Sequence, residues 1–265
     1  MDLYYKIVTY VLAGVLGLCV GSFLNVVIYR VPIGLNLATP SSHCPKCKYV
    51  LRWYDNIPVL SYIILGGKCR NCKARISFRY TAVELANMVF LLISVALFWK
   101  RSIPFACIAA LASSVLICVF FIDLEHKLIF DRFVIVIAVL GIAAVFFDPY
   151  YAWLSHIIGG VGGFVSFYGI AYLFIKIKKV EGLGGGDIKL TAVCGLLLGW
   201  QRLLLSILMA TITASIVLLL LSRKNAKEGT GDKEYPFAPF LSTAFAISMF
   251  CGERLIALYL SLLGL

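Results

Sequence analysis

The sequence predicts an all-α protein, a polytopic bundle of about eight transmembrane helices with one small cysteine-rich insertion. Two observations predict this class. Of the 265 residues, 62% are hydrophobic and only 14% are charged, a composition far from that of soluble domains. The hydrophobic residues also gather in long runs that short polar segments separate. Together these features exclude a soluble enzyme.

The apolar runs predict eight spans, at residues 7–29, 80–98, 103–122, 131–147, 155–176, 187–199, 202–222 and 237–262. The first run is too long for the hydrophobic core of a signal peptide, and no small-residue cleavage site follows it, so we expect a retained span. The sixth run is short and predicts a tilted or half-buried helix.

The distribution of basic residues predicts the orientation of these spans. With an outside N-terminus, the cytoplasmic segments are 30–79, 123–132, 176–189 and 223–235, and they hold 19 of the 24 Lys and Arg residues. This orientation places both Asp123 and Asp187 on the cytoplasmic side. The net charge of +11 is therefore interpreted as a topology signal that faces anionic lipid headgroups, and not as a nucleic-acid site.

The only sizeable polar segment, residues 30–79, carries two Cys-x-x-Cys pairs, formed by Cys44 with Cys47 and by Cys69 with Cys72. Two such pairs separated by 21 residues are typical of a closed tetrahedral zinc site. We expect structural zinc in a zinc-ribbon-like cytoplasmic insertion. Four thiolates leave no open coordination position for catalysis, and so small a segment needs a metal or a cross-link to be stable. The alternative is thiol redox chemistry.

The most informative motif is Gly184-Gly-Gly-Asp187, which stands directly before an apolar run. A carboxylate at a membrane boundary is costly and indicates function. Asp123 ends another apolar run on the same predicted side. Two neighbouring acids in a poorly solvated site should share one proton, so that one activates water and the other polarises a scissile carbonyl. Asp131 and Glu125 are alternative partners, and an ordinary pairing of the acids with Lys127 and Lys189 is the structural alternative.

Other polar residues lie inside the predicted spans. Ser22 and Asn25, near the end of the first span, either bond between helices or line a groove. Glu84 is predicted to stabilise the N-terminus of the second span. Two Gly-x-x-x-Gly pairs, Gly17 with Gly21 and Gly159 with Gly163, predict close helix packing. The five cysteines outside the tetrad are predicted to be packing residues: Cys19, Cys107, Cys118, Cys194 and Cys251.

Several segments taken together resemble the type IV prepilin peptidases, a family of membrane aspartic proteases of the GxGD type. The matching pieces are residues 21–32, the cysteine tetrad, Pro58-Val-Leu-Ser-Tyr62, Arg79-Tyr-Thr-Ala-Val-Glu84, Phe121-Ile-Asp123, Glu181-Gly-Leu-Gly-Gly-Gly-Asp-Ile-Lys-Leu190 and Pro236-Phe-Ala-Pro-Phe240. The resemblance covers nearly the whole chain. One departure is Ile129-Phe130-Asp131, where the family usually has Ile-Pro-Asp.

The resemblance implies a multi-pass protein of the bacterial inner membrane that cleaves the basic leader of type IV prepilins or pseudopilins at the cytoplasmic face. It implies Asp123 and Asp187 as the catalytic pair. It also implies N-methylation of the new N-terminus with S-adenosylmethionine, for protein secretion or pilus assembly. The acids available to contact a basic leader are Glu125, Glu181 and Glu234.

The expected parts are a first transmembrane helix (1–29), the four-cysteine zinc segment with the methyltransferase part (30–79) and the transmembrane peptidase (80–265). The expected partners are the substrates and membrane lipids. Two other functions compete with this interpretation. A zinc-stapled transporter should show an internal repeat, and none is found. A membrane thiol oxidoreductase needs only one reactive cysteine pair.

Overall fold

A computed structural model describes residues 3–39, 41–179, 182–228 and 235–262, and these parts contain helices and no strand. The chain divides into two compact units, Met1–Trp99 and Lys100–Leu265. The predicted functional parts, 1–29, 30–79 and 80–265, do not coincide with these units, because the helix that follows the cysteine segment packs on the first helix.

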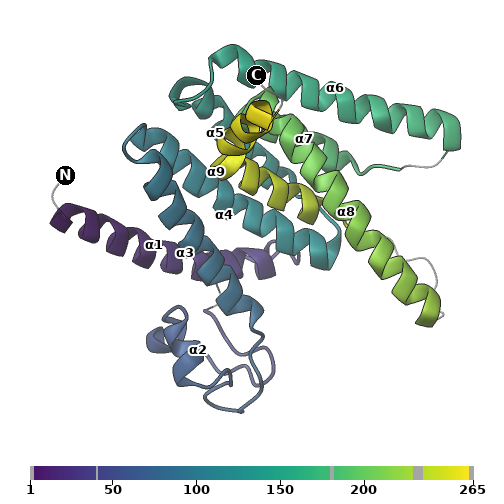
Figure 1. Cartoon of the computed structure of the whole chain (residues 1–265). Helices are drawn as coiled ribbons and strands as arrows, with labels where there is room; N and C mark the ends of the chain where they lie inside the picture. The colour runs from purple at the N-terminus through teal and green to yellow at the C-terminus, as the bar shows by residue number, and fades with distance from the viewer. Residues whose placement is uncertain (1–2, 40, 180–181, 229–234, 263–265) are drawn as a thin grey trace. The chain divides into compact units, whose positions relative to one another are not determined.

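The first unit contains two long helices, α1 (Leu3–Arg30) and α3 (Arg79–Phe98), which pack side by side (Figure 1). Glycines allow this contact. A Cβ added at Gly17 or Gly21 would lie 2.7 Å from the Cα of Met88 or Glu84, respectively. These glycines therefore let the two backbones touch, which confirms the close packing predicted for the first Gly-x-x-x-Gly pair.

The segment between α1 and α3 carries little regular structure. It contains the 3₁₀ helix η1 (Trp53–Asn56) and the five-residue helix α2 (Leu60–Ile64). Each cysteine pair lies in a tight turn closed by an isolated antiparallel bridge, His43 with Val50 in the first turn and Lys68 with Arg75 in the second. Lys48 and Lys73 adopt positive φ in these two turns, so the two cysteine-containing turns have the same local backbone structure.

The second unit is a bundle of six helices in the part of the chain that the structure describes. They are α4 (Ile103–His126), α5 (Asp131–Phe147), α6 (Trp153–Lys178), α7 (Gly185–Leu198), α8 (Trp200–Glu228) and α9 (Ala238–Leu262). The most buried of the spanning helices, α4, packs against α5 and α9, and α7 packs against α5 and α6 (Figure 1). The bundle thus encloses α4 and α7, the helices that carry Asp123 and Asp187.

The helices α6 and α7 contact each other closely at glycine residues. A Cβ added at Gly159 would overlap the carbonyl oxygen of Gly195, and one added at Gly163 would lie 3.0 Å from that of Thr191. The second Gly-x-x-x-Gly pair therefore packs closely, as predicted, and its partner is α7. This close contact positions α7 along the axis of α6.

The eight long helices of the described chain correspond closely to the eight predicted spans, which confirms a helical polytopic architecture. Six of these helices are long and apolar enough to cross a membrane: α1, α3, α4, α6, α8 and α9. The other two, α5 with 17 residues and α7 with 14, are shorter. A short sixth helix was expected, because residues 187–199 form the shortest apolar run.

Candidate functional site

Asp123 lies in the last turn of α4, and the residue is only 5% exposed. The C-terminal end of a helix disfavours a negative charge. The backbone N–H of Ala238, the first residue of α9, donates a hydrogen bond to the Asp123 carboxyl group. A helix N-terminus is therefore aimed at this acid, and the Pro236-Phe-Ala-Pro-Phe240 motif provides it.

Asp187 is the third residue of α7 and therefore lies in its first turn, at the positive end of the helix. Its Oδ1 atom is buried and has no hydrogen-bond partner among the described residues. Its carboxylate lies close enough to Asp123 for the two charges to interact. The structure thus brings together two acids that are 64 positions apart in the chain.

The glycines before Asp187 differ in what surrounds them. A Cβ added at Gly186 would lie 2.9 Å from the Cβ of Ile129, in the connection between α4 and α5, whereas one at Gly185 would meet nothing within 4 Å. Gly186 therefore lets α7 approach this connection closely. Gly184 precedes the helix as its N-cap.

The alternative acids have different surroundings. Asp131 is exposed, and its Oδ1 atom lies 2.7 Å from the Nζ atom of Lys189. Glu125 is also exposed. Within the described chain, no ion pair joins a cation to Asp123 or Asp187. The structural alternative, in which Lys127 and Lys189 are the partners of the two acids, is therefore not found among the described residues, and Lys189 binds Asp131 instead.

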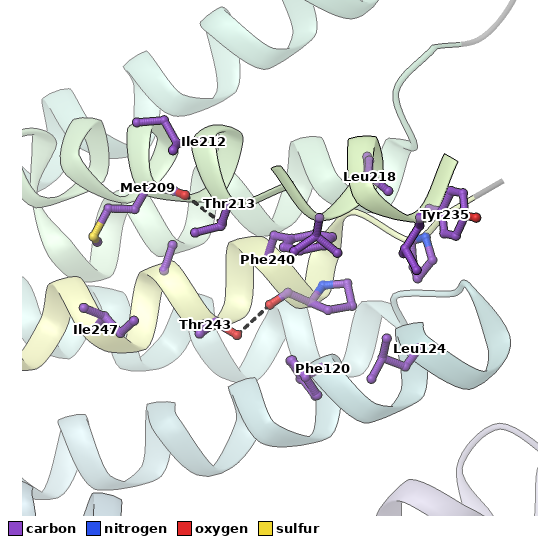
Figure 2. A pocket seen from close by; sticks show the side chains of 15 residues that line it. Phe120, Leu124, Met209, Ile212, Thr213, Leu218, Tyr235, Phe240, Thr243 and Ile247 are labelled. Atoms are coloured by element: carbon purple, nitrogen blue, oxygen red, sulfur yellow. Dashed lines mark hydrogen bonds between the residues drawn. The ribbon is translucent and has the colours of Figure 1, made fainter. Parts of the chain in front are cut away.

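An apolar cavity of about 530 Å³ lies between α4, α8 and α9 (Figure 2). Phe120 and Leu124, on either side of Asp123 in the chain, form its α4 wall. Pro239 and Phe240, which follow the N–H donor Ala238, line the α9 wall. The cavity therefore adjoins the turn of α4 that carries Asp123.

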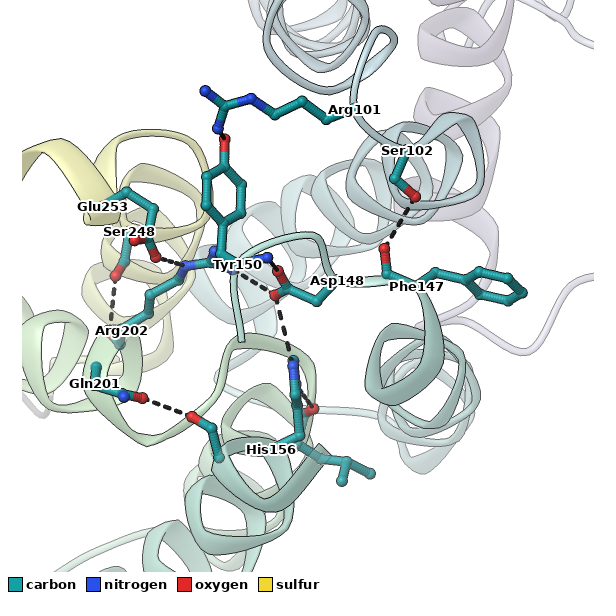
Figure 3. Close-up of polar contacts among 12 residues, drawn as sticks. Arg101, Ser102, Phe147, Asp148, Tyr150, His156, Gln201, Arg202, Ser248 and Glu253 are labelled. Carbon is teal, nitrogen blue, oxygen red and sulfur yellow. Dashed lines mark hydrogen bonds and ion pairs between the residues drawn. The ribbon is translucent and has the colours of Figure 1, made fainter. Parts of the chain in front are cut away.

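A second polar cluster in this unit centres on Arg202, which is only 1% exposed (Figure 3). Its Nη1 atom lies 2.8 Å from Asp148, and its Nε atom lies 3.0 Å from Glu253. Its guanidinium group also lies 4.7 Å from the ring centroid of Tyr151. We call this group the Arg202 network.

The Arg202 network ties together the helix ends remote from the acid pair. Asp148 follows α5, Arg202 is in the first turn of α8 and Glu253 is on α9. The ring of His156, near the start of α6, lies 3.6 Å from Asp148 through Nε2 (Figure 3). Burial, together with a hydrogen bond to Glu253, raises the pKa of the Tyr151 phenol above its usual value. The network therefore pairs its acids with a cation.

The four tetrad cysteines converge in the first unit. Their sulfur atoms all lie within 4.8 Å of one another, and both Cys44–Cys72 and Cys47–Cys69 are separated by 3.9 Å. That spacing is far too long for disulfides and close to the ~3.8 Å edge of a tetrahedron with Zn–S bonds of about 2.3 Å. The backbone N–H of Tyr49 lowers the pKa of the Cys47 thiol to about 6. These residues fit zinc.

A third polar cluster, also in the first unit, joins α1, α3 and the Pro58-Val59 turn. The backbone N–H of Val59 donates to the Glu84 carboxylate at 2.8 Å, and the Ser22 hydroxyl donates to the same group. Asn25 donates to the Tyr80 carbonyl at 3.0 Å. We call Ser22, Asn25, Val59 and Glu84 the Glu84 cluster. The expectation that Glu84 stabilises its own helix N-terminus is wrong, since its carboxylate binds the turn instead.

Val59 is strained. It has φ 61° and ψ −49°, and the Leu60 N–H donates to the Pro58 carbonyl at 2.6 Å. This is a γ-turn of the rare positive-φ kind, at a β-branched residue. Such a conformation costs about 1–3 kcal/mol and is often found at functional sites. The bond to Glu84 holds the turn in place.

Sequence reasoning missed some of these residues. No sequence motif singles out Arg202, Asp148 or His156. The signal that could have identified them is their position within one turn of apolar runs, where an ionisable residue needs a partner. Of the acids expected to contact a basic leader, Glu125 is exposed, and Glu181 and Glu234 lie outside the described residues.

The fold and the acid pair define a class of protein, a helical membrane protein with two adjacent carboxyl groups at one end of its bundle. Residues 15–100 match the bacterial peptidase A24 N-terminal domain, and residues 110–219 match the type IV leader peptidase family. The chain belongs to this family and is therefore a peptidase. No solved structure matches it.

Curated relatives named prepilin leader peptidase/N-methyltransferase match most of the chain. The Pseudomonas aeruginosa protein is 35% identical over 94% of this chain and 92% of its own length. The Myxococcus xanthus protein is 38% identical over 86% of this chain and 69% of its own length. The Legionella pneumophila protein is 31% identical over 95% of this chain and 94% of its own length.

Proposed function

We propose that this protein is an intramembrane aspartic endopeptidase of the bacterial inner membrane. It cleaves the basic leader of type IV prepilins or pseudopilins at the cytoplasmic face and then methylates the new N-terminus. One observation carries the proposal: Asp123 and Asp187 lie together without a paired cation in the described chain, while Asp131 is bound to Lys189. The names of the relatives supply the substrate class.

Asp123 and Asp187 are the proposed catalytic pair. Because they are close and poorly solvated, they share one proton. The ionised acid takes a proton from water, which attacks the scissile carbonyl, and the protonated acid donates to the carbonyl oxygen. The Ala238 N–H holds the Asp123 carboxyl in position throughout.

The apolar cavity beside Asp123 supports a substrate that is itself embedded in lipid. Its walls on α4, α8 and α9 are almost entirely hydrophobic, so they suit an apolar segment next to the cleaved bond. The basic leader would lie on the polar side of the acids, where Glu125 is exposed. Glu181 and Glu234 remain candidates for the same contact.

The second activity is proposed for the first unit. Zinc held by Cys44, Cys47, Cys69 and Cys72 would stabilise segment 30–79, since the free energy of metal binding contributes directly to the folding of so small a segment. S-adenosylmethionine, the methyl donor that N-methyltransferase chemistry implies, is charged and soluble, so its site should open to the cytosol beside this segment. The peptidase chemistry lies within 80–265.

The direct test is incubation of the purified protein with a prepilin that bears a basic leader, with and without S-adenosylmethionine, followed by mass spectrometry. We expect cleavage in both samples and one added methyl group only with the donor. An intact substrate would contradict the proposal and favour the transporter. Metal analysis of the same preparation separates zinc from the thiol oxidoreductase, which needs no bound metal.

Separate sites for the two activities can be tested with Asp187→Asn. Because the acid pair belongs to the second unit and the cysteine segment to the first, this variant should bind S-adenosylmethionine as tightly as the natural protein. A binding titration measures this. Loss of donor affinity together with cleavage would mean one shared site.

A further inference from the structure

The proposed cleavage reaction uses no residue of the Glu84 cluster. Glu84 and Asn25 are both buried, at 8% and 5% exposure, whereas Ser22 and Val59 are half-buried. Gly21, one turn before Asn25, contacts the Glu84 backbone, and Asn25 binds Tyr80, one turn before Glu84. The acid and the amide therefore occupy adjacent turns of one helix pair, beside a strained turn.

The cluster contains an excess of hydrogen-bond acceptors. The Asn25 amide nitrogen donates to the carbonyls of Tyr80 and Gly21, which fixes the amide orientation and leaves its buried Oδ1 atom without a partner. The Glu84 carboxylate accepts from Val59 and Ser22 and is paired with no cation among the described residues. A buried carboxylate and a buried amide oxygen both need a donor, and the carboxylate favours a cationic one.

We propose that the Glu84 cluster binds a primary ammonium group during N-methylation, with Glu84 and Asn25 Oδ1 as its acceptors. The inference rests on the methylation half of the proposed function. An ammonium group offers three N–H donors, which suffice for both acceptors, and one positive charge, which complements the negative charge of Glu84. The half-buried Val59 turn and Ser22 form the edge of this site.

The position of the cluster suits such a ligand. Asn25 lies five residues before the end of α1, and Glu84 lies five residues after the start of α3. At 1.5 Å per residue, each side chain is about 7.5 Å inside its helix end. The site therefore lies near headgroup depth, next to the zinc-held segment.

Two molecules in the reaction carry a primary ammonium group, namely the new N-terminus of the cleaved substrate and the methionyl part of the donor. With the new N-terminus bound, Glu84 accepts a proton from the ammonium group. The free amine then attacks the methyl carbon of the sulfonium donor. A C–N bond forms, the C–S bond breaks, and its electron pair stays on sulfur as a thioether.

The test uses the full-length protein and a pre-cleaved pilin peptide with a free N-terminus, so that methylation does not depend on cleavage. Glu84→Gln keeps an acceptor for the Val59 N–H but removes the charge, and methylation should fall about 100-fold or more. Asn25→Ala should reduce it about 10-fold. Asn87→Ala is the matched control, because Asn87 also donates across the α1–α3 contact, to Gly17 at 2.8 Å.

The outcomes separate the two ligands. Unchanged affinity of Glu84→Gln for S-adenosylmethionine, with methylation lost, assigns the site to the new N-terminus, and weakened affinity assigns it to the donor. Wild-type methylation by Glu84→Gln, or an equal loss in Asn25→Ala and Asn87→Ala, would overturn the proposal. Natural protein that cleaves prepilin but never methylates would instead refute the methylation half of the proposed function, and this site with it.

Discussion

The second unit contains two groups of acids at half-buried or buried positions, and they are neutralised differently. In the Arg202 network, Asp148 and Glu253 both bind one guanidinium group. In the acid pair, Asp123 and Asp187 lie close enough for their charges to interact, and neither has a paired cation in the described chain. Buried charges persist only when they are paired or when function retains them. The difference favours the proposal that the network holds helices together, whereas the acid pair serves the chemistry of cleavage.

The largest expected effect is on cleavage. Asp123→Asn and Asp187→Asn should each reduce prepilin cleavage by about 10²–10⁴-fold or more, because one acid cannot both activate water and protonate the carbonyl. Cleavage is measured by mass spectrometry, and membrane insertion by fractionation. Full activity in either variant would remove the pair from consideration.

The second expected effect is on stability. Arg202→Ala leaves Asp148 and Glu253 without their common cation, so the free energy of unfolding should fall by about 3–5 kcal/mol. Denaturant unfolding in detergent measures this. Arg254→Ala, one residue from Glu253, serves as the control, and an equal loss there would mean that the network has no special structural role.

Removal of zinc should separate the two activities. Serine at Cys44, Cys47, Cys69 or Cys72 should release the metal and loosen segment 30–79, so methylation should fall more than cleavage. Elemental analysis and the two activity assays on one preparation check this. Metal-free natural protein with full methylation would contradict it.

A smaller effect is expected at the glycines. Gly186→Ala should reduce cleavage about 10-fold, because its Cβ would meet Ile129 at 2.9 Å and displace the start of α7. Gly185→Ala is the matched control, because its Cβ has open space and alanine favours a helix. Equal loss in both variants would show that helix-start flexibility, and not close approach, matters.

The smallest effect should come from the acid that is ion-paired. Asp131→Asn breaks only an exposed bridge to Lys189, worth about 0–1 kcal/mol, so cleavage should stay within about threefold of the natural rate. Initial rates on the prepilin substrate check this. A loss as large as that of Asp123→Asn would favour Asp131 as the partner of Asp187.

Much of the fold was predictable because lipid imposes long apolar helices, and the runs 131–147 and 80–98 agree with α5 and α3 to within one residue. The tetrad was predictable because four thiolates at this spacing have few other uses. Packing partners were not. An apolar run such as 80–98 does not reveal which helix it contacts. In the sequence, Arg202 resembles any cation at a membrane boundary, and only the tertiary structure shows that it binds Asp148 and Glu253. Similarly, no local pattern predicts that the Ala238 N–H binds Asp123.

The claim that unpaired acids serve chemistry and paired acids serve stability is tested most directly by one paired measurement. Cleavage rate and unfolding temperature are measured together for Asp187→Asn and Asp148→Asn. We expect Asp187→Asn to lose cleavage while its unfolding temperature stays unchanged or rises, and Asp148→Asn to unfold at a lower temperature while its folded fraction still cleaves. Cleavage retained in Asp187→Asn, or destabilisation equal to that of Asp148→Asn, would contradict the account.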